Sequence, residues 1–302
     1  MKIAITGVTG FVGQNLARYL SDTDILGVSR EAKGLNIGYP ELSLNILNEQ
    51  NAFIHLAGKA HDLKKTSDDK EYFEVNTELT KNLFDQFLKS DCETFIYMSS
   101  VKAVADVVDG VLTEDVIPNP KTVYGKSKLA AEVYILSKEI PKNKRVYILR
   151  PSMIHGPKNK GNLNLLYSFV SKGIPYPFGK FVNRRSFLSI ENLCFIIKEL
   201  INNKKIESGI YNIADDISLS TISLVKVISE VLCKPTRILK VPKLFVRFIA
   251  KIGDLLPIPL NSERLQKLTE DYEVSNLKIK NAIQKELPLN ALDGVKKTIA
   301  SF

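Results

Sequence analysis

The stretch "KIAITGVTGFVGQNLARYL" (residues 2–20) joins a short apolar run to a segment with helical periodicity through a glycine-rich turn. The apolar run is typical of a buried strand, and the periodic segment is typical of an amphipathic helix. Three glycines stand in the turn: Gly7, Gly10 and Gly13. In this position glycines allow a tight turn, a close approach of backbone to a pyrophosphate, and close packing of helix on strand. The stretch predicts a dinucleotide site with phosphate at the helix N-terminus.

Strand-like and helical segments continue to alternate up to Pro151. Further strands are expected at 24–29, 51–57, 93–100 and 145–151, and helices at 70–89 and 122–138. Such alternation predicts an α/β fold, a Rossmann-type doubly wound parallel sheet with right-handed crossovers. The ligand of such a sheet lies outside the carboxyl ends of its strands.

The pattern changes after Pro151, where proline and glycine cluster and short mixed elements follow. We expect residues 1–160 to form the dinucleotide-binding domain and residues 161–302 to form a smaller, mainly substrate-binding lobe. Helices are expected near 191–203, 220–232 and 288–301, and strands near 181–190 and 209–213. These two strands could rejoin the first domain, so the boundary should not be clean.

The composition argues against several classes of protein. The 302 residues are 44% hydrophobic and carry a formal charge of +9, but the basic residues are scattered without a run of five. We therefore expect no nucleic-acid partner. The cysteines and histidines show no metal-ligand spacing, so no metal is expected and the protein is interpreted as cytoplasmic. The N-terminus leaves no room for a signal peptide.

The segment "VPKLFVRFIAKIGDLLPIPL" (241–260) is the most apolar late stretch. Four charged residues interrupt it: Lys243, Arg247, Lys251 and Asp254. Because of these charges, it is too polar to span a bilayer, and no stable membrane insertion is expected. We expect an amphipathic helix packed on the protein body, and an interfacial membrane helix is the less favoured alternative.

The residues after the second strand bear on the choice of dinucleotide. An acidic residue there would hydrogen-bond the ribose 2′-hydroxyl of NAD, but this chain has Ser29 and Arg30, with Lys33 close by. A serine and an arginine can bind a 2′-phosphate through charge-assisted contacts. Glu31 stands one position late, and a solvated surface charge is the alternative role for Arg30. The sequence favours NADP(H), with NAD(H) as the second choice.

The pattern Tyr-x-x-x-Lys, which places two side chains on one helix face, occurs three times. The pairs are Tyr124/Lys128, Tyr134/Lys138 and Tyr176/Lys180. A lysine one turn away and a positively charged nicotinamide would lower the pKa of the tyrosine, which could then exchange a proton with a substrate. The pattern alone does not choose among the pairs, nor between chemistry and a solvated helix face.

An ordered set of motifs makes the choice. The motifs are "TGVTGFVG" at 6–13, "HLAG" at 55–58, "YMSS" at 97–100, "YGKSK" at 124–128 and "LRPSMIHGP" at 149–157. Together they resemble the extended short-chain dehydrogenase/reductase superfamily, in its NAD-dependent epimerase/dehydratase family. The likeness runs to roughly residue 240 and is greatest to bacterial UDP-N-acetylhexosamine 4-ketoreductases and 4-epimerases. Of the three pairs, only Tyr124/Lys128 follows "SS" at the family's spacing and precedes "LRP", so the resemblance makes Tyr124 the catalytic residue.

One departure from the family concerns the group that polarises the substrate carbonyl. Relatives carry Ser or Thr at a position where this chain has Val101. The role then falls to Ser100 or Ser99, or to Lys102. A catalytically silent NADP(H)-binding sensor is the alternative from another class, and the intact Tyr–Lys pair argues against it. A dehydratase is less favoured, because the residues after Val101 offer no carboxylate.

The resemblance also implies the cofactor contacts, with Lys128 expected to hold the nicotinamide ribose beside Tyr124. The other expected residues are Gly7, Thr9, Gly10, Phe11, Val12, Gly13, Ser29, Arg30, Asn45, Ile46, Leu56, Ala57, Gly58, Asn76, Pro151 and Ile154.

The substrate side is implied in the same way. Phe178 is expected to stack on uracil, and Arg185, with Arg184 as its substitute, to bind the diphosphate bidentately. Asn162 is expected to contact the nucleotide, and His155 to line the pocket without acting as a base. Hinge packing is the alternative for Phe178, and a surface charge is the alternative for Arg185.

The resemblance thus implies an enzyme that reduces the C4 keto group of a UDP-linked sugar with NAD(P)H, in the synthesis of surface polysaccharide precursors. The expected sugar is an N-acetylated 6-deoxy hexose. A 4-epimerase with tightly bound NAD is the main alternative. A homodimer through the helices at 70–89 and 122–138 is also implied.

Overall fold

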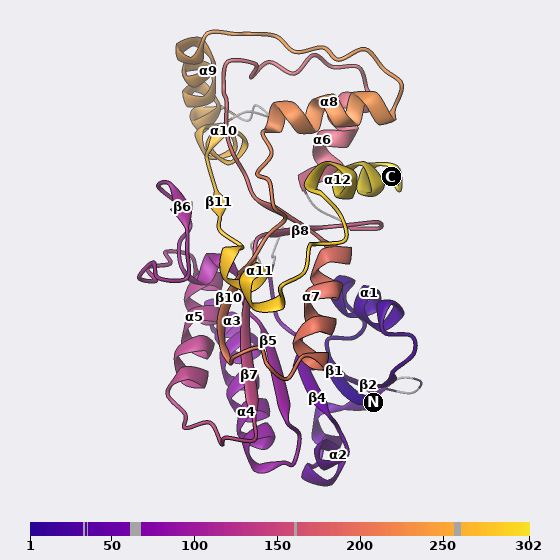
Figure 1. The fold of residues 1–302 in the computed structure, drawn as a ribbon. Helices are drawn as coiled ribbons and strands as arrows, with labels where there is room; N and C mark the ends of the chain where they lie inside the picture. The colour runs from indigo at the N-terminus through magenta and orange to yellow at the C-terminus, as the bar shows by residue number, and fades with distance from the viewer. Residues whose placement is uncertain (33, 35, 61–67, 160–161, 257–260) are drawn as a thin grey trace.

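The computed structural model describes residues 1–302 apart from 33, 35, 61–67, 160–161 and 257–260. A seven-stranded parallel sheet runs through the molecule, with helices to either side of it (Figure 1). In order across the sheet, the strands are β10 (Gly209–Ile213), β7 (Arg145–Pro151), β5 (Thr94–Met98), β4 (Ala52–His55), β1 (Lys2–Thr6), β2 (Asp24–Ser29) and β3 (Ile37–Gly38). The chain begins at β1 in the interior of the sheet and runs through β2 to the edge strand β3. It then crosses back to β4 and continues through β5 and β7 to the opposite edge strand, β10. This order confirms the predicted doubly wound sheet.

Helices cover both faces of the sheet, as an all-parallel sheet requires. One face carries α1 (Phe11–Tyr19), α7 (Ile190–Asn202) and α11 (Leu277–Ile283). The other face carries α2 (Leu44–Asn48), α4 (Leu79–Lys89) and α5 (Val123–Leu136). Alternate strand residues point to opposite faces, so neighbouring residues in β1 enter different layers: Ile3 and Ile5 pack in the first, Ala4 in the second.

The helix expected over 70–89 is continuous but not regular. It consists of α3 (Asp69–Phe73), a π-helical turn (Glu74–Glu78) and α4. A π-helical turn changes the direction of the side chains around it, and such turns are frequent at functional sites. Here the turn buries Asn76 and Thr77, whose side chains hydrogen-bond to Ser127 of α5.

The lobe has its own apolar core and lies beyond the carboxyl ends of the strands (Figure 1). Its helices are α6 (Asn162–Ser171), α8 (Thr221–Val231), α9 (Lys243–Leu255), α10 (Ser262–Thr269) and α12 (Ala291–Ile299). Two small parallel sheets join distant segments: β8 (Met153–His155) with β9 (Phe187–Ser189), and β6 (Val111–Leu112) with β11 (Glu273–Val274). Short 3-10 turns lie at Tyr39–Glu41 and Val101–Ala103.

The chain crosses between the two parts more than once. β10 joins the large sheet beside β7, and α7 and α11 cover that sheet although both follow residue 160. The strand expected near 181–190 is short and pairs with β8 outside the large sheet. The sheet-bearing part is therefore assembled from both halves of the sequence.

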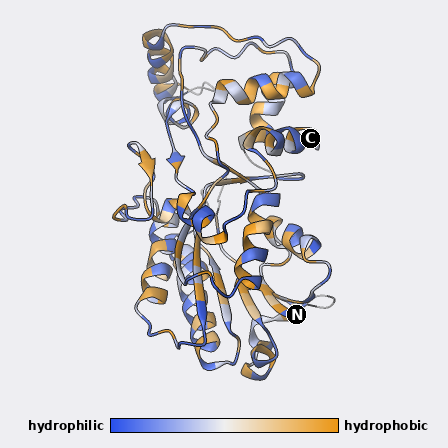
Figure 2. Cartoon of the chain, in the orientation of Figure 1, coloured by the Kyte–Doolittle hydropathy of each residue, from blue (hydrophilic) through white to orange (hydrophobic). Residues whose placement is uncertain are grey.

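α9 departs from the packing expected of it. Of its 13 residues, Val246 and Ala250 are buried, whereas Leu244, Phe248 and Leu255 are exposed. Apolar and polar side chains alternate along it (Figure 2). The expectation that its apolar face packs on the protein body is therefore wrong for most of that face. Among the described residues, no helix is both long and apolar enough to cross a bilayer.

Candidate active site

The glycine-rich turn between β1 and α1 is shaped by close backbone contacts. Gly7 has a φ of +70°, and a Cβ there would lie 2.8 Å from the amide nitrogen of Ala57. A Cβ at Gly13 would lie 2.4 Å from the carbonyl oxygen of Gly7. The Gly10 amide closes the turn by donating to the Gly7 carbonyl at 3.0 Å. Side chains at positions 7 and 13 would therefore push α1 and the segment after β4 away from the turn.

The N-terminus of α1 fits an anionic group. Thr9 and Gly10 are exposed at its start, and Gly10, as the N-cap, has no side chain to bond the first-turn amides. The amides of Phe11, Val12 and Gly13 point out of the helix without an acceptor from the preceding turn. Together with the helix dipole they form a site for phosphate. The residues present thus fit the diphosphate of a dinucleotide.

The carboxyl end of β2 carries the residues expected at the adenosine ribose. The Ser29 hydroxyl donates to the main-chain carbonyl of Glu31 at 2.6 Å, and Arg30 is exposed. Burial raises the pKa of Tyr39, and the nearby Arg30 guanidinium partly offsets this. Lys33 lies outside the described residues. Binding of a 2′-phosphate by Ser29 and Arg30 stays a prediction.

The first turn of α5 is fixed against the Val101–Ala103 turn. Thr122 is the N-cap, and its hydroxyl accepts from the Gly125 amide at 3.2 Å while donating to Asp106 at 2.9 Å. A Cβ at Gly125 would lie 2.3 Å from the carbonyl oxygen of Lys102, so only glycine allows this approach. The contact brings Tyr124, the residue before Gly125 in the helix, beside the segment that follows β5.

Ser100 is the hydroxyl that the structure places beside Tyr124. Burial raises the pKa of Tyr124, the hydrogen bond with Ser100 lowers it, and the nearby Tyr72 raises it again. The net shift is upward, so Tyr124 is a neutral phenol at neutral pH. In the protein alone burial dominates, so the lowering of this pKa expected from Lys128 together with a positively charged nicotinamide stays a prediction. Ionisation needs further positive charge in the site.

Lys128 is buried, and its side chain is held by residues of β5. Its Nζ donates to the Met98 carbonyl at 2.8 Å and lies 4.9 Å from the centre of the Tyr97 ring. Burial lowers the pKa of Lys128 to about 8, and the Glu132 carboxylate opposes that shift. A Cβ at Gly58 would lie 2.9 Å from Nζ. Glycine there leaves one side of the ammonium open, as binding to a ribose hydroxyl requires.

Asn76, on the π-helical turn, connects the segment after β4 to α5. Its Oδ1 accepts from the Lys59 amide at 2.8 Å. Its Nδ2 donates to the Lys59 carbonyl at 3.0 Å and to the Ser127 hydroxyl at 2.9 Å. With all its polar atoms engaged by protein, Asn76 fixes the floor of the site around Gly58.

His55 supports the same floor and is not a proton acceptor. It lies between the hydroxyls of Thr6, at 2.7 Å, and Thr80, at 2.9 Å. Burial and the neighbouring Lys128 lower the pKa of His55 to about 3, so the imidazole is neutral. Next to it, the amides of Leu56 and Ala57 donate to the backbone and side chain of Thr6. This bonding fixes the "HLAG" segment against the glycine-rich turn.

Ser99 points away from Tyr124 and into a buried ionic cluster. Its hydroxyl donates to Glu132. The Glu132 carboxylate also accepts hydrogen bonds from Arg150, from Nε at 3.1 Å and from Nη2 at 2.6 Å. Of the two serines offered by the sequence, Ser100 is therefore the one beside the Tyr124 hydroxyl. Glu132 was not anticipated, although it stands at Tyr124 + 8 and Lys128 + 4, a spacing that places all three on one helix face.

Lys102 is turned toward the lobe. Its Nζ donates to the Asp106 carbonyl at 2.8 Å and lies 4.1 Å from the centre of the Tyr272 ring. The Tyr272 hydroxyl donates to the Ala105 carbonyl at 2.6 Å. This placement does not support Lys102 as the polarising group. Tyr272 was not expected next to this segment, because it follows α10 in an irregular stretch that none of the motifs covers.

The two candidate diphosphate residues differ in placement. The Arg185 side chain is 17% exposed, lies 4.0 Å from Glu270, and has its pKa lowered by burial. Its backbone pairs with Leu219. The Arg184 side chain is 68% exposed and pairs with Glu273 at 2.9 Å. Arg185 is therefore the better placed of the two, and its binding to a diphosphate stays a prediction.

Phe178 lies in the lobe core. Its ring meets Tyr176 edge-on with 5.2 Å between centroids, and Phe181 with 6.0 Å, and the residue is only 6% exposed. Packing, the alternative role for this residue, is what the structure shows, and stacking on uracil stays a prediction. Asn162 is the first residue of α6, and its side chain lies outside the described part of the chain.

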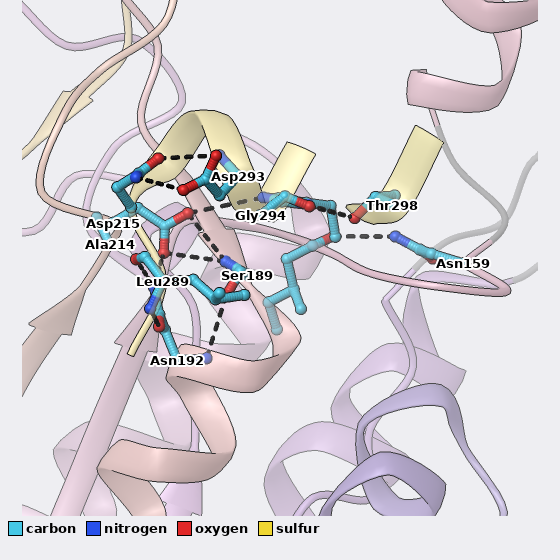
Figure 3. A network of polar contacts seen from close by, with 12 residues as sticks. Asn159, Ser189, Asn192, Ala214, Asp215, Leu289, Asp293, Gly294 and Thr298 are labelled. Carbon is cyan, nitrogen blue, oxygen red and sulfur yellow. Dashed lines mark hydrogen bonds and ion pairs between the residues drawn. The ribbon is translucent and has the colours of Figure 1, made fainter. Parts of the chain in front are cut away.

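His155 does not join the Tyr124 site. Its Nδ1 lies 2.9 Å from the Thr298 hydroxyl and its Nε2 lies 3.7 Å from Asp215. Asp215 also accepts from the Ser189 amide and from Asn192, in a buried network between β8, α7 and α12 (Figure 3). His155 lines a separate cavity between α1, α7 and α12. This placement does not support the expectation that His155 lines the substrate pocket, which stays a prediction.

The other expected cofactor residues fall into two groups. Pro151 ends β7 and Ile154 lies in β8, where it packs in the layer with α1 and α7. Asn45 and Ile46 lie on α2 at the foot of the sheet, where Ile46 packs in the layer with α4 (Figure 1). The structure does not bring these two together with the glycine-rich turn, because α2 returns the chain toward the amino end of β4.

Comparisons with known proteins agree with this geometry. A sequence model of the NAD dependent epimerase/dehydratase family matches residues 3–214. The UDP-glucose 4-epimerase of Vibrio cholerae is 32% identical over 100% of this chain and 95% of that protein. The N-acetyl-alpha-D-glucosaminyl-diphospho-ditrans,octacis-undecaprenol 4-epimerase of Escherichia coli O157:H7 is 26% identical over 92% of this chain and 84% of that protein. The Bacillus cereus UDP-glucuronic acid 4-epimerase, solved with UDP-glucuronic acid and NAD, superposes with a TM-score of 0.75 at 20% identity, over 100% of this chain and 98% of that one.

Proposed function

Because the chain belongs to the NAD dependent epimerase/dehydratase family of nucleotide-sugar enzymes, we propose that it is a 4-epimerase of a UDP-linked hexose, with an N-acetylated hexosamine as the favoured sugar. The observation that carries the proposal is the placement of Tyr124 beside Ser100, on the same helix as the buried Lys128 and one helical turn before it. Both curated relatives described above are 4-epimerases. For this reason the epimerase ranks above the 4-ketoreductase, the reverse of the order that the sequence favoured.

Tyr124, Ser100 and Lys128 would each have a different role in the oxidation of C4. A dinucleotide bound at the glycine-rich turn would supply the acceptor for the hydride of C4. The C4 hydroxyl lies between Tyr124 and Ser100, where Tyr124 takes its proton and Ser100 donates a hydrogen bond to the same oxygen. Lys128 would hold the ribose. The further positive charge that Tyr124 needs to ionise would come from the oxidised nicotinamide, because burial raises the pKa of Tyr124 in the protein alone. Inversion would then require the keto sugar to turn over, so that the hydride held by the reduced cofactor could return to the opposite face of C4 while Tyr124 gave the proton back to the oxygen.

A dehydratase would need a carboxylic acid next to the polarising hydroxyl. The Val101–Ala103 turn supplies none. The Asp106 carboxylate, a little further on, accepts from the amides of Lys121 at 2.6 Å and Thr122 at 3.2 Å, and these bonds lower its pKa although burial opposes them. A carboxylate held ionised by the N-terminal approach to α5 is a poor general acid, so oxidation without elimination is the favoured chemistry.

A 4-ketoreductase is the second candidate, and Ser29 with Arg30 favours it. An exposed arginine at the end of β2 suits the 2′-phosphate of NADPH. A reductase exchanges its cofactor in every turnover, whereas an epimerase regenerates the same molecule. The two candidates therefore differ in what stays bound to the purified protein.

The test combines cofactor identity with product analysis. Wild-type protein and the Tyr124→Phe variant are denatured, and the released dinucleotide is identified by mass spectrometry. The folded proteins are then incubated with UDP-N-acetylglucosamine, UDP-glucose and, in view of one relative's substrate, undecaprenyl-diphosphate-linked N-acetylglucosamine. We expect stoichiometric NAD in both proteins and C4 inversion of one sugar by the wild type alone.

Other outcomes assign other functions. An empty site, together with NADPH-dependent reduction of a 4-keto sugar nucleotide, would replace the epimerase by the reductase. Retained dinucleotide without turnover of any sugar would favour the silent sensor.

A further inference from the structure

α9 exposes a continuous apolar stripe. Leu244 is 80% exposed, Phe248 62% and Leu255 88%. Their spacing of four and seven residues places them on one side of the helix. Phe245, on the neighbouring row, is 56% exposed and widens the stripe. Large apolar side chains gathered in this way on one helix mark an interaction surface rather than ordinary surface variation.

The stripe is not the face by which α9 packs on the lobe. Val246 and Ala250 are buried and lie four residues apart on the opposite side of the helix from Phe248. They are part of the lobe core with Leu265 of α10. α9 therefore has one small face against the protein and one broad apolar face that no described residue covers.

The same part of the chain carries an excess of positive charge. Residues 231–256 contain six basic residues and one acidic residue. This short segment therefore carries more than half of the formal net charge of +9 of the whole protein. The basic residues are Lys234, Arg237, Lys240, Lys243, Arg247 and Lys251, and all are exposed. The single acid, Asp254, accepts from the amide and hydroxyl of Ser262. Arg247 and Lys251 lie along one edge of the apolar stripe.

We propose that α9 and the basic segment before it dock the protein on the surface of an anionic phospholipid bilayer. In this arrangement the stripe enters the boundary between headgroups and acyl chains, while the basic side chains contact the phosphates. The helix lies in the plane of the surface, since Lys243, Arg247 and Lys251 prevent it from crossing. An apolar face beside a row of Lys and Arg is the pattern of such interfacial helices.

The charge distribution favours a lipid surface over a second copy of the chain. A two-fold contact through α9 would place the same basic row on both sides of the interface. Asp254 alone, already engaged by Ser262, could not offset that repulsion. Anionic headgroups offset it directly.

Docking through α9 has a consequence for the catalytic site. α10 follows α9, and the chain then reaches Tyr272, whose hydroxyl bonds to the Ala105 carbonyl beside the Val101–Ala103 turn. A protein held by α9 would thus present the Tyr272 side of its lobe near the bilayer.

The proposal is tested by co-sedimentation with vesicles. Full-length protein is mixed with vesicles of phosphatidylcholine alone or with added phosphatidylglycerol, at low and high salt. One variant carries Leu244→Gln and Phe248→Gln, and a second carries Arg247→Glu and Lys251→Glu. The matched controls are Leu277→Gln and Lys142→Glu, which change exposed side chains on other elements.

We expect the wild type and both controls to sediment with the anionic vesicles at low salt. Each α9 variant should lose at least about tenfold in partitioning, with folding and dinucleotide content unchanged. Absence of binding to anionic vesicles, or binding that both α9 variants retain, would overturn the proposal. So would a wild-type dimer that the Leu244/Phe248 variant converts to monomer in analytical ultracentrifugation, since a second copy would then be the occupant.

Discussion

At the residue scale, the site depends on which of two adjacent serines faces Tyr124. The Ser99 hydroxyl donates to Glu132, which also binds Arg150, whereas Ser100 lies beside Tyr124. We therefore propose that Ser100 takes the role of the hydroxyl that is missing at Val101. The sequence offered both serines and could not choose, because the choice depends on where Arg150 of β7 meets α5.

The serines give the first prediction. Ser100→Ala should lower kcat by about 10²-fold, because it removes a donor to the reacting oxygen. Ser99→Ala should leave kcat within a few-fold and lower the free energy of unfolding by about 1–3 kcal/mol, because a buried Glu132 oxygen loses its partner. Steady-state kinetics and urea denaturation measure both. Equal kinetic effects of the two substitutions would contradict the assignment.

Lys128 gives a prediction of pH dependence. Its folded pKa of about 8 lies below the ordinary value of 10.5, because burial disfavours the ammonium. The unfolded chain therefore binds more protons between these values, so this group makes the protein more stable as pH rises from about 8 toward 10. Lys128→Met should remove that rise. Urea denaturation at intervals from pH 7 to 9.5 checks it, and parallel curves for the two proteins would contradict it.

At the element scale, α5 is tied to β7 by a buried ion pair. Arg150 and Glu132 are 3% and 1% exposed, and two of the Arg150 nitrogens reach the carboxylate. Since α5 carries Tyr124 and Lys128, this contact fixes the position of these two residues relative to the sheet. The sequence predicted α5 and β7 within two residues at each end, but a pattern along one element does not show contacts between elements.

The ion pair gives a third prediction. Glu132→Gln should lower the free energy of unfolding by about 3–5 kcal/mol, because it leaves a buried guanidinium without a counter-charge. Adding Arg150→Met should recover a large part of that loss. Chemical denaturation of the single and double variants measures the coupling. If the changes in the free energy of unfolding of the two single variants simply added up in the double variant, the pair would not hold the two elements together.

The sequence predicted elements better than their irregularities. Strand 145–151 and the helices at 122–138 and 220–232 follow from apolar periodicity and lie close to where they were expected. The π-helical turn at Asn76 was not predictable, because it depends on hydrogen bonds to Lys59 and Ser127. Phe178 and His155 were assigned by position in a motif, whereas their placement is decided by packing against residues far along the chain.

At the scale of the whole molecule, the lobe reaches the site through contacts that sequence patterns do not reveal. β11 pairs with β6 across more than 150 positions, and Tyr272 precedes β11 directly. Tyr272→Phe removes the bond to the Ala105 carbonyl. We expect KM for the sugar nucleotide to rise about five- to tenfold with little change in kcat, since about 1 kcal/mol of lobe contact is lost. Steady-state kinetics check this, and an unchanged KM would contradict it.

The central claim is that Tyr124 serves C4 inversion with a cofactor that stays bound. It is tested most directly by proton NMR of UDP-N-acetylglucosamine and UDP-glucose incubated with purified protein and no added dinucleotide. We expect one C4 epimer to accumulate to equilibrium with the wild type and none to form with Tyr124→Phe. No epimer of either sugar, with turnover only after NADPH and a 4-keto sugar nucleotide are supplied, would contradict it.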